Sequence, residues 1–145
     1  MAATARIATL LCLSALTLSA CGQTDKDSAS DFKGDQKAVA QTVEDLQTAS
    51  RKSDETKLCN DVLAPALVTK IKTSSKGGTC ESAIKDALRD VDSWELTVKK
   101  VAIDGTTATA TVQSDTGKDN RLDTLTLVKV GNTWKISELG SATSS

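Results

Sequence analysis

The sequence predicts an α+β domain in which N-terminal helices pack in a curved antiparallel meander sheet. In the first half of the chain, apolar residues recur every three or four positions, as in amphipathic helices. From Trp94 onward the apolar residues alternate with polar ones, as in half-buried strands. Asp104-Gly105 and Gly131-Asn132 are dipeptides that favour tight turns between antiparallel strands. Helices followed by such hairpins are typical of α+β folds.

The first expected helix runs from Gln36 to about Lys52, with Asp35 as its N-cap. Spacings of four, three and three residues place its apolar side chains on one stripe. That stripe consists of Val39, Val43, Leu46 and Ala49.

Three shorter helical segments follow. Ser53 is expected to cap the first, and Pro65 ends it because the residue before a proline avoids helical geometry. Pro65 can itself open the second, which ends near Gly77. Thr79 is expected to cap the third, from Cys80 to about Val91.

Two hairpins are expected after Trp94. The alternation slips between Val98 and Val101, which predicts a β-bulge at Lys99-Lys100. Pairing about the Asp104-Gly105 turn sets Val101 opposite Ala108 on the second strand, 106–113.

The third strand is expected over 122–130. Pairing about the Gly131-Asn132 turn sets Leu127 opposite Ile136 and Lys129 opposite Trp134. This register places Leu125, Leu127, Trp134 and Ile136 on one face.

Residues 1–20 are typical of a lipoprotein signal peptide. Arg6 is their single charge, and an apolar run too short for a comfortable bilayer span follows it. Leu18-Ser19-Ala20-Cys21 resembles the bacterial lipobox, which implies cleavage between Ala20 and Cys21 and a diacylglyceryl group on the Cys21 sulfur. Two acyl chains suffice for stable anchoring. The sequence therefore predicts a protein anchored at the extracytoplasmic face of the cell membrane; an uncleaved helix and an ordinary secretory signal are the alternatives.

Residues 21–35 are expected to form a lipidated flexible tether. They are rich in Gly, Ser, Asp and Lys, and such a composition buries too little apolar surface to order a chain. Phe32 is the exception and lies in helical register with Val39, so it could dock on the domain. The domain is expected over 36–140, followed by a disordered tail over 141–145.

Four cysteines remain to be assigned. Cys12 leaves with the signal peptide and Cys21 takes the lipid, so Cys59 and Cys80 are left in a compartment that permits disulfides. We expect them to be bonded to each other, with unpaired thiols as the alternative. A metal site would need further nitrogen or sulfur ligands, and the chain contains no histidine.

Composition and charge argue against several function classes. Beyond residue 20 the chain carries 17 basic and 19 acidic side chains, which gives no basic surface for nucleic acid. The sequence shows no phosphate-binding loop, metal-ligand cluster or nucleophile motif, so no cofactor and no metal is expected.

The order of elements resembles the NTF2-like family, and more narrowly the small NTF2-like lipoproteins of high-GC Gram-positive bacteria. The resemblance covers about residues 36–140. It is carried by the Asp104-Gly105 turn, the hairpin over 131–136, and the pair Cys59 and Cys80. It implies a curved sheet that wraps the helices into a cone with a cavity at its open end. A cystatin-like arrangement of one helix on a sheet is the nearest rival, and it leaves the helices over 65–91 without a place.

The resemblance implies a non-catalytic binding or interaction module for a small apolar ligand or an envelope protein partner. The alternative is an isomerase or cyclase like the enzymes of the family, which needs a base and an oxyanion stabiliser. Without His or Tyr, the candidate bases are carboxylates such as Asp86, Asp90 and Asp92. A passive spacer or regulator of a membrane protein is a third possibility.

Overall fold

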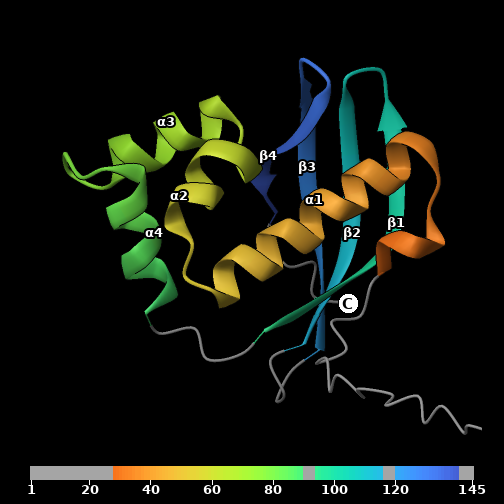
Figure 1. The fold of residues 1–145 in the computed structure, drawn as a ribbon, viewed down its shortest axis with the longest axis horizontal. Coiled ribbons are helices and arrows are strands. Elements are labelled where there is room, and N and C mark those ends of the chain that lie inside the picture. The colour runs from red at the N-terminus through yellow and green to blue at the C-terminus, as the bar shows by residue number, and fades with distance from the viewer. Residues whose placement is uncertain (1–27, 90–93, 116–119, 141–145) are drawn as a thin grey trace, which may run out of the picture.

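The computed structural model describes residues 28–89, 94–115 and 120–140, and it has the predicted order of helices followed by a sheet (Figure 1). The helical elements are η1 (Ser28–Asp31), α1 (Gly34–Arg51), α2 (Glu55–Lys57), η2 (Leu58–Val62), α3 (Pro65–Ser74) and α4 (Cys80–Leu88). The strands are β1 (Glu95–Asp104), β2 (Thr107–Asp115), β3 (Asn120–Val130) and β4 (Thr133–Leu139). They form one antiparallel sheet in the order β1-β2-β3-β4.

The core lies between α1 and one face of the sheet. In Figure 1, α1 crosses the strands obliquely, while α2, α3 and α4 gather beyond its C-terminal end. The predicted stripe of α1 is buried, and the alternation in β2 buries its alanines and Val112 while exposing Thr107 and Thr109. The largest side chains sealed in this layer are at most 2% exposed: Val39, Val43, Leu127, Trp134 and Ile136.

Two of the predicted helix starts are confirmed, and two are wrong. Pro65 opens α3, and the Thr79 hydroxyl accepts a hydrogen bond from the Ser82 N–H at 3.1 Å at the start of α4. Asp35 lies inside the first turn of α1 and does not cap it. The cap of α2 is Asp54, because Ser53 has φ +50° in a left-handed turn whereas a capping residue usually has an extended backbone.

The tether predicted for residues 21–35 is too long, because its last part belongs to the folded domain. Ala29 is 1% exposed, and its N–H donates to the Glu44 carboxylate at 2.7 Å. The Ser28 hydroxyl accepts the Val98 N–H at 3.2 Å. Small side chains let this backbone pack closely on α1 and β1, and Phe32 packs against the core as expected. The domain therefore extends to Ser28, while residues 21–27 and the tail over 141–145 lie outside the described residues.

The register of the second hairpin is confirmed, and that of the first is shifted by two. Leu127 pairs with Ile136 and Lys129 with Trp134, as predicted. The bulge lies between Val98 and Lys100, also as predicted, but Val101 pairs with Ala110 instead of Ala108. Asp104 pairs with Thr107, so the turn is one residue later than the Asp-Gly signal indicated. A shift of two residues keeps every side chain on its predicted face.

Within the described part of the chain, no helix combines the length and the apolar character that crossing a membrane would require.

Candidate functional site

A pocket of about 250 Å³ lies between the second half of α1 and the sheet. Each strand contributes to it, and most of its wall is apolar. Leu46, Trp94, Leu96, Val112, Leu125 and Leu139 supply the apolar wall, and Arg121, Asp123 and Gly140 complete the lining.

The alternation of β3 brings the two charged side chains to this wall. Arg121 is four residues and Asp123 two residues before the buried Leu125, so all three share the inward face. Val112 pairs with Asp123, and Leu139 of β4 pairs with Leu125. The pocket is therefore apolar near the core and charged toward the start of β3.

Hydrogen bonds fix the walls of the pocket. The buried Ser114 hydroxyl donates to Oδ2 of Asp123 at 2.7 Å. The Gln47 side chain is 5% exposed, and its carbonyl oxygen accepts the Leu96 N–H, which ties α1 to β1 beside the pocket. Arg121 is exposed and forms no ion pair with the described carboxylates.

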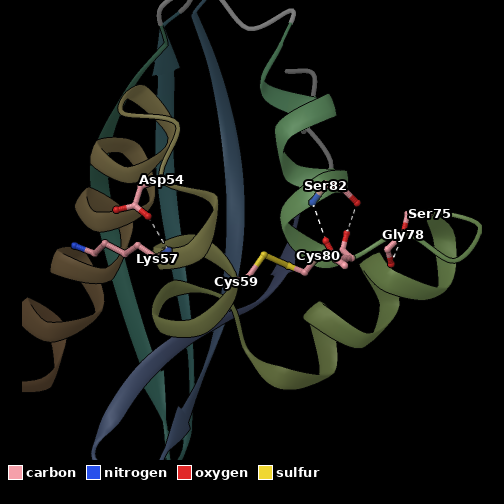
Figure 2. Close-up of a disulfide and its surroundings, with 8 residues drawn as sticks. Asp54, Lys57, Cys59, Ser75, Gly78, Cys80 and Ser82 are labelled. Carbon is pink, nitrogen blue, oxygen red and sulfur yellow. Dashed lines mark hydrogen bonds between the residues drawn. A yellow bond between two sulfur atoms is a disulfide. The ribbon is translucent and has the colours of Figure 1, made fainter.

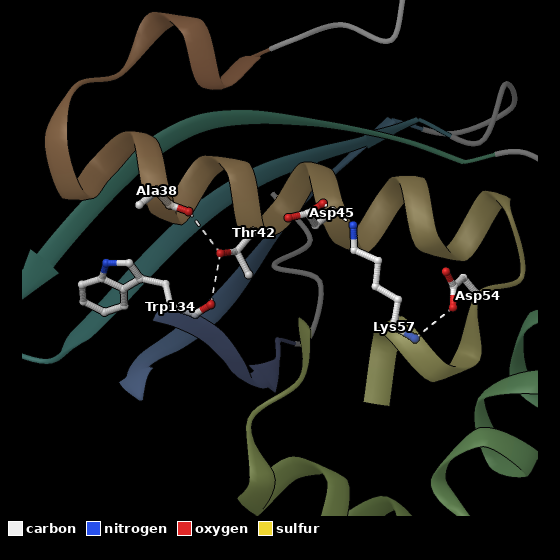
Figure 3. Close-up of polar contacts among 6 residues, drawn as sticks. All are labelled: Ala38, Thr42, Asp45, Asp54, Lys57 and Trp134. Atoms are coloured by element: carbon white, nitrogen blue, oxygen red, sulfur yellow. Dashed lines mark hydrogen bonds and ion pairs between the residues drawn. The ribbon is translucent and has the colours of Figure 1, made fainter. Parts of the chain in front are cut away.

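The two tryptophans have different surroundings. Trp134 is a core residue at 2% exposure, and its carbonyl accepts the Thr42 hydroxyl at 3.2 Å (Figure 3). Trp94 is half-buried and is the aromatic side chain of the pocket wall. Trp94 is thus the tryptophan with a ring placed to meet a ligand.

The predicted disulfide is present. Cys59 in η2 is bonded to Cys80 at the start of α4, with 6.1 Å between their Cα atoms (Figure 2). Both cysteines are buried. Neither lines the pocket, so their role in this fold is to hold helices together.

The other residues predicted for function are not brought to the pocket. Asp86 is exposed and pairs with Arg89 at 2.7 Å on α4. Asp90 and Asp92 lie outside the described residues, as do Ala20 of the predicted cleavage site and Cys21, the predicted lipid attachment site. Among residues 28–89, 94–115 and 120–140, no group of three or more metal-binding side chains is found.

Sequence reasoning missed Arg121 and Asp123. The available signal was the period of two, which extends backward from Leu125 through both charged residues. Charged residues at the end of a strand usually face solvent, so only the position of α1 and β4 shows that these two line a cavity.

The polar contact between α1 and α2 lies outside the pocket. Lys57 Nζ donates to the Asp45 carboxylate at 2.8 Å, and both side chains are partly exposed (Figure 3). This hydrogen bond, followed by the charge of Asp45, raises the pKa of Lys57 above its ordinary value. The contact therefore adds to the attachment of α2 but has no part in the site.

Comparisons with known proteins agree with this architecture. The model of the family described as "Putative lumazine-binding" matches residues 34–138. The structure is also similar to an NTF2-like protein of unknown function from Shewanella baltica OS155, with a TM-score of 0.50 and 20% sequence identity. That similarity covers 74% of this chain and 93% of the other, and at this identity it shows the fold alone.

A search of curated proteins found no match to the chain. The NTF2-like resemblance of the sequence is confirmed at the level of the fold. Because the family model spans well over half of the chain, this protein belongs to the family described as "Putative lumazine-binding".

Proposed function

We propose that the protein is a non-catalytic binding module that is held at the extracytoplasmic face of the membrane by a lipid on Cys21. Its pocket between α1 and the sheet would hold a small, mostly apolar ligand. The observation that carries the proposal is the cavity of about 250 Å³ with an apolar wall and a charged end.

The chemistry of the pocket supports ligand binding. Small-molecule sites are mainly apolar cavities with a few placed polar groups, and those for drug-sized ligands occupy about 300–1,000 Å³. A volume of about 250 Å³ suits a smaller molecule. The description of the family names lumazine, a small bicyclic heteroaromatic compound, which makes lumazine the first ligand to test.

An isomerase or cyclase is the alternative, and Asp123 is the observation that favours it. Its carboxylate lines an apolar cavity, as a catalytic base would. Against this, one carboxylate oxygen already accepts the Ser114 hydroxyl, and the chain has no His or Tyr to serve as a second acid or base. Product formation from a bound ligand, lost in Asp123→Asn while binding persists, would establish the enzyme in place of the binding module.

A pair of tryptophan substitutions tests whether the pocket binds ligand. Leu139 is 56% exposed on the pocket wall, so Leu139→Trp should fill the pocket from outside at little cost to the core. Val130 is 41% exposed at the far end of β3, which makes Val130→Trp the matched control. In equilibrium dialysis with lumazine, we expect Leu139→Trp to weaken binding at least about ten-fold and Val130→Trp to leave it unchanged. Equal binding by both variants would place the ligand elsewhere.

The lipid anchor is supported by the lipobox and by the position of Ser28. Six residues lie between Cys21 and Ser28, so a fully extended chain spans at most about 25 Å between them. The folded domain would thus be held close to the bilayer. Intact mass spectrometry should show a chain that begins at Cys21 and carries the added lipid mass. Cys21→Ala should lack the lipid mass and Cys12→Ala should retain it; a mature chain beginning at an unmodified Met1 would refute the anchor.

A further inference from the structure

We propose that Arg121 and Asp123 select a ligand that presents an N–H donor beside a C=O acceptor on one edge of a flat ring, as an imide or ureide does. This inference rests on the proposed ligand binding in the same pocket. It adds the chemistry of the polar edge, which neither the fold nor the apolar wall specifies.

The first argument is charge. Arg121 and Asp123 are separated by one residue on the inward face of β3, so their Cα atoms are about 7 Å apart. One positive and one negative side chain give this end of the pocket no net charge. For an anionic ligand, attraction to Arg121 is opposed by repulsion from Asp123, and for a cationic ligand the two interactions are reversed. A neutral ligand with both a donor and an acceptor matches the pair.

The second argument is the state of the guanidinium. Arg121 has no hydrogen bond or ion pair with a described side chain, although Asp123 lies on the same face. A guanidinium carries five N–H donors in a fixed plane. These donors are therefore available to a carbonyl oxygen at the mouth of the pocket.

The third argument is the orientation of the carboxylate. Ser114 is 5% exposed, and its hydroxyl donates to Oδ2 of Asp123 at 2.7 Å. This hydrogen bond ties the carboxylate to β2 and fixes its direction. Because an ionised carboxylate can accept about four hydrogen bonds, Asp123 retains the capacity to accept an N–H from a ligand.

The body of the ligand would meet Trp94 and the leucines of α1, β1 and β3. Trp94 supplies the one aromatic ring of the pocket wall, and aromatic rings favour stacked or edge-on contact with other flat rings. A flat ring buried against this wall would bring its polar edge toward Asp123 and Arg121.

Three bicyclic probes test the inference. Lumazine has N–H groups flanked by carbonyls, 1,3-dimethyllumazine has the carbonyls without those N–H groups, and quinoxaline has a similar ring skeleton without either. Binding is measured calorimetrically to the full-length protein in lipid nanodiscs, with empty nanodiscs as the blank. We expect the wild-type protein to bind lumazine about ten-fold more tightly than its dimethyl derivative, because one charge-assisted hydrogen bond is lost.

Variants of Asp123 and Arg121 test which residue binds the N–H of the ligand and which binds its carbonyl. In Asp123→Asn the preference for lumazine over the dimethyl compound should fall to about two-fold, because the amide is uncharged, has one acceptor oxygen in place of two and presents N–H donors. In Arg121→Leu the affinities for lumazine and for its dimethyl derivative should both fall about ten-fold, since both compounds retain the carbonyls. The ratio of the two affinities should therefore stay as in the wild type. Lys100→Leu removes an exposed cation from β1 outside the pocket and should change nothing.

The outcomes separate this inference from the proposed function. Equal wild-type affinity for lumazine and its dimethyl derivative would overturn the inference, as would an unchanged ratio in Asp123→Asn. Tight quinoxaline binding with no preference for lumazine would support ligand binding in the pocket and would refute selection by Arg121 and Asp123. If none of the three probes binds, the proposed function and the inference both fail.

Discussion

The helices α1 and the α3–α4 pair are attached to the sheet in different ways. Eight residues of α1 are buried, and they form one wall of the core and of the pocket. In contrast, α3 has no buried residue and α4 has only Cys80. Half-buried side chains such as Leu67 and Ile84 pack on the core, and the covalent bond from Cys80 to Cys59 adds a further constraint (Figure 2).

This difference indicates that the pocket depends on the packing of α1 against the sheet. Burial of apolar area positions α1, and contributes roughly 25 cal/mol per Å². A disulfide instead acts mainly by restricting the unfolded chain. The pocket should therefore tolerate loss of the disulfide better than loss of the α1–sheet core.

The largest expected effect comes from the core between α1 and the sheet. Trp134→Ala removes a side chain that is 2% exposed and should lower the free energy of unfolding by about 3–5 kcal/mol. Leu139→Ala, at 56% exposure, is the control and should cost far less. Urea unfolding followed by circular dichroism measures both; equal midpoints would mean that the core is not where stability resides.

Removal of the disulfide should affect the two regions differently. Cys59→Ser combined with Cys80→Ser removes a disulfide between residues with a sequence separation of 21. In the chain-entropy model this lowers the free energy of unfolding by about 3 kcal/mol. Hydrogen exchange should accelerate mainly in α3 and α4 under native conditions, with α1 and the strands still protected. Uniform acceleration across the chain would contradict the distinction between the two regions.

The segment before α1 should behave as part of the core region. Ser28→Ala leaves the Val98 N–H without its acceptor at a buried position, which costs about 1–3 kcal/mol. Gln41→Ala changes an exposed residue of α1 and serves as the control. Thermal unfolding compares the two; a Ser28→Ala protein as stable as the control would mean that η1 is dispensable.

The contact between Lys57 and Asp45 joins α2 to α1, and its loss should have the smallest effect on stability. Folding raises the pKa of Lys57 above its ordinary value of 10.5. The contact therefore contributes fully to the free energy of unfolding below pH 10.5, and this contribution is lost as pH rises through the folded pKa. The melting temperature of Asp45→Asn should be slightly below that of the wild type at pH 8, and the two should converge above pH 10.5. The gap should also narrow in high salt, since the pair is partly exposed.

Several features followed directly from local patterns in the sequence. The period of two placed Ala108, Ala110 and Val112 on the buried face, and the Gly131-Asn132 turn set the register of the last hairpin correctly. Pro65 and Thr79 marked helix starts correctly because capping depends on neighbours within one turn.

By itself, the sequence determined the fold class, the faces of the strands and the pairing of Cys59 with Cys80. Only the tertiary structure decided that Ser28 docks on Val98, 70 residues away, and that Arg121 and Asp123 line a cavity. Periodicity reports which side of an element is apolar, and it is a local property. Docking of a polar segment or closure of a pocket depends on which distant backbone and side-chain groups meet, and no local pattern encodes that meeting.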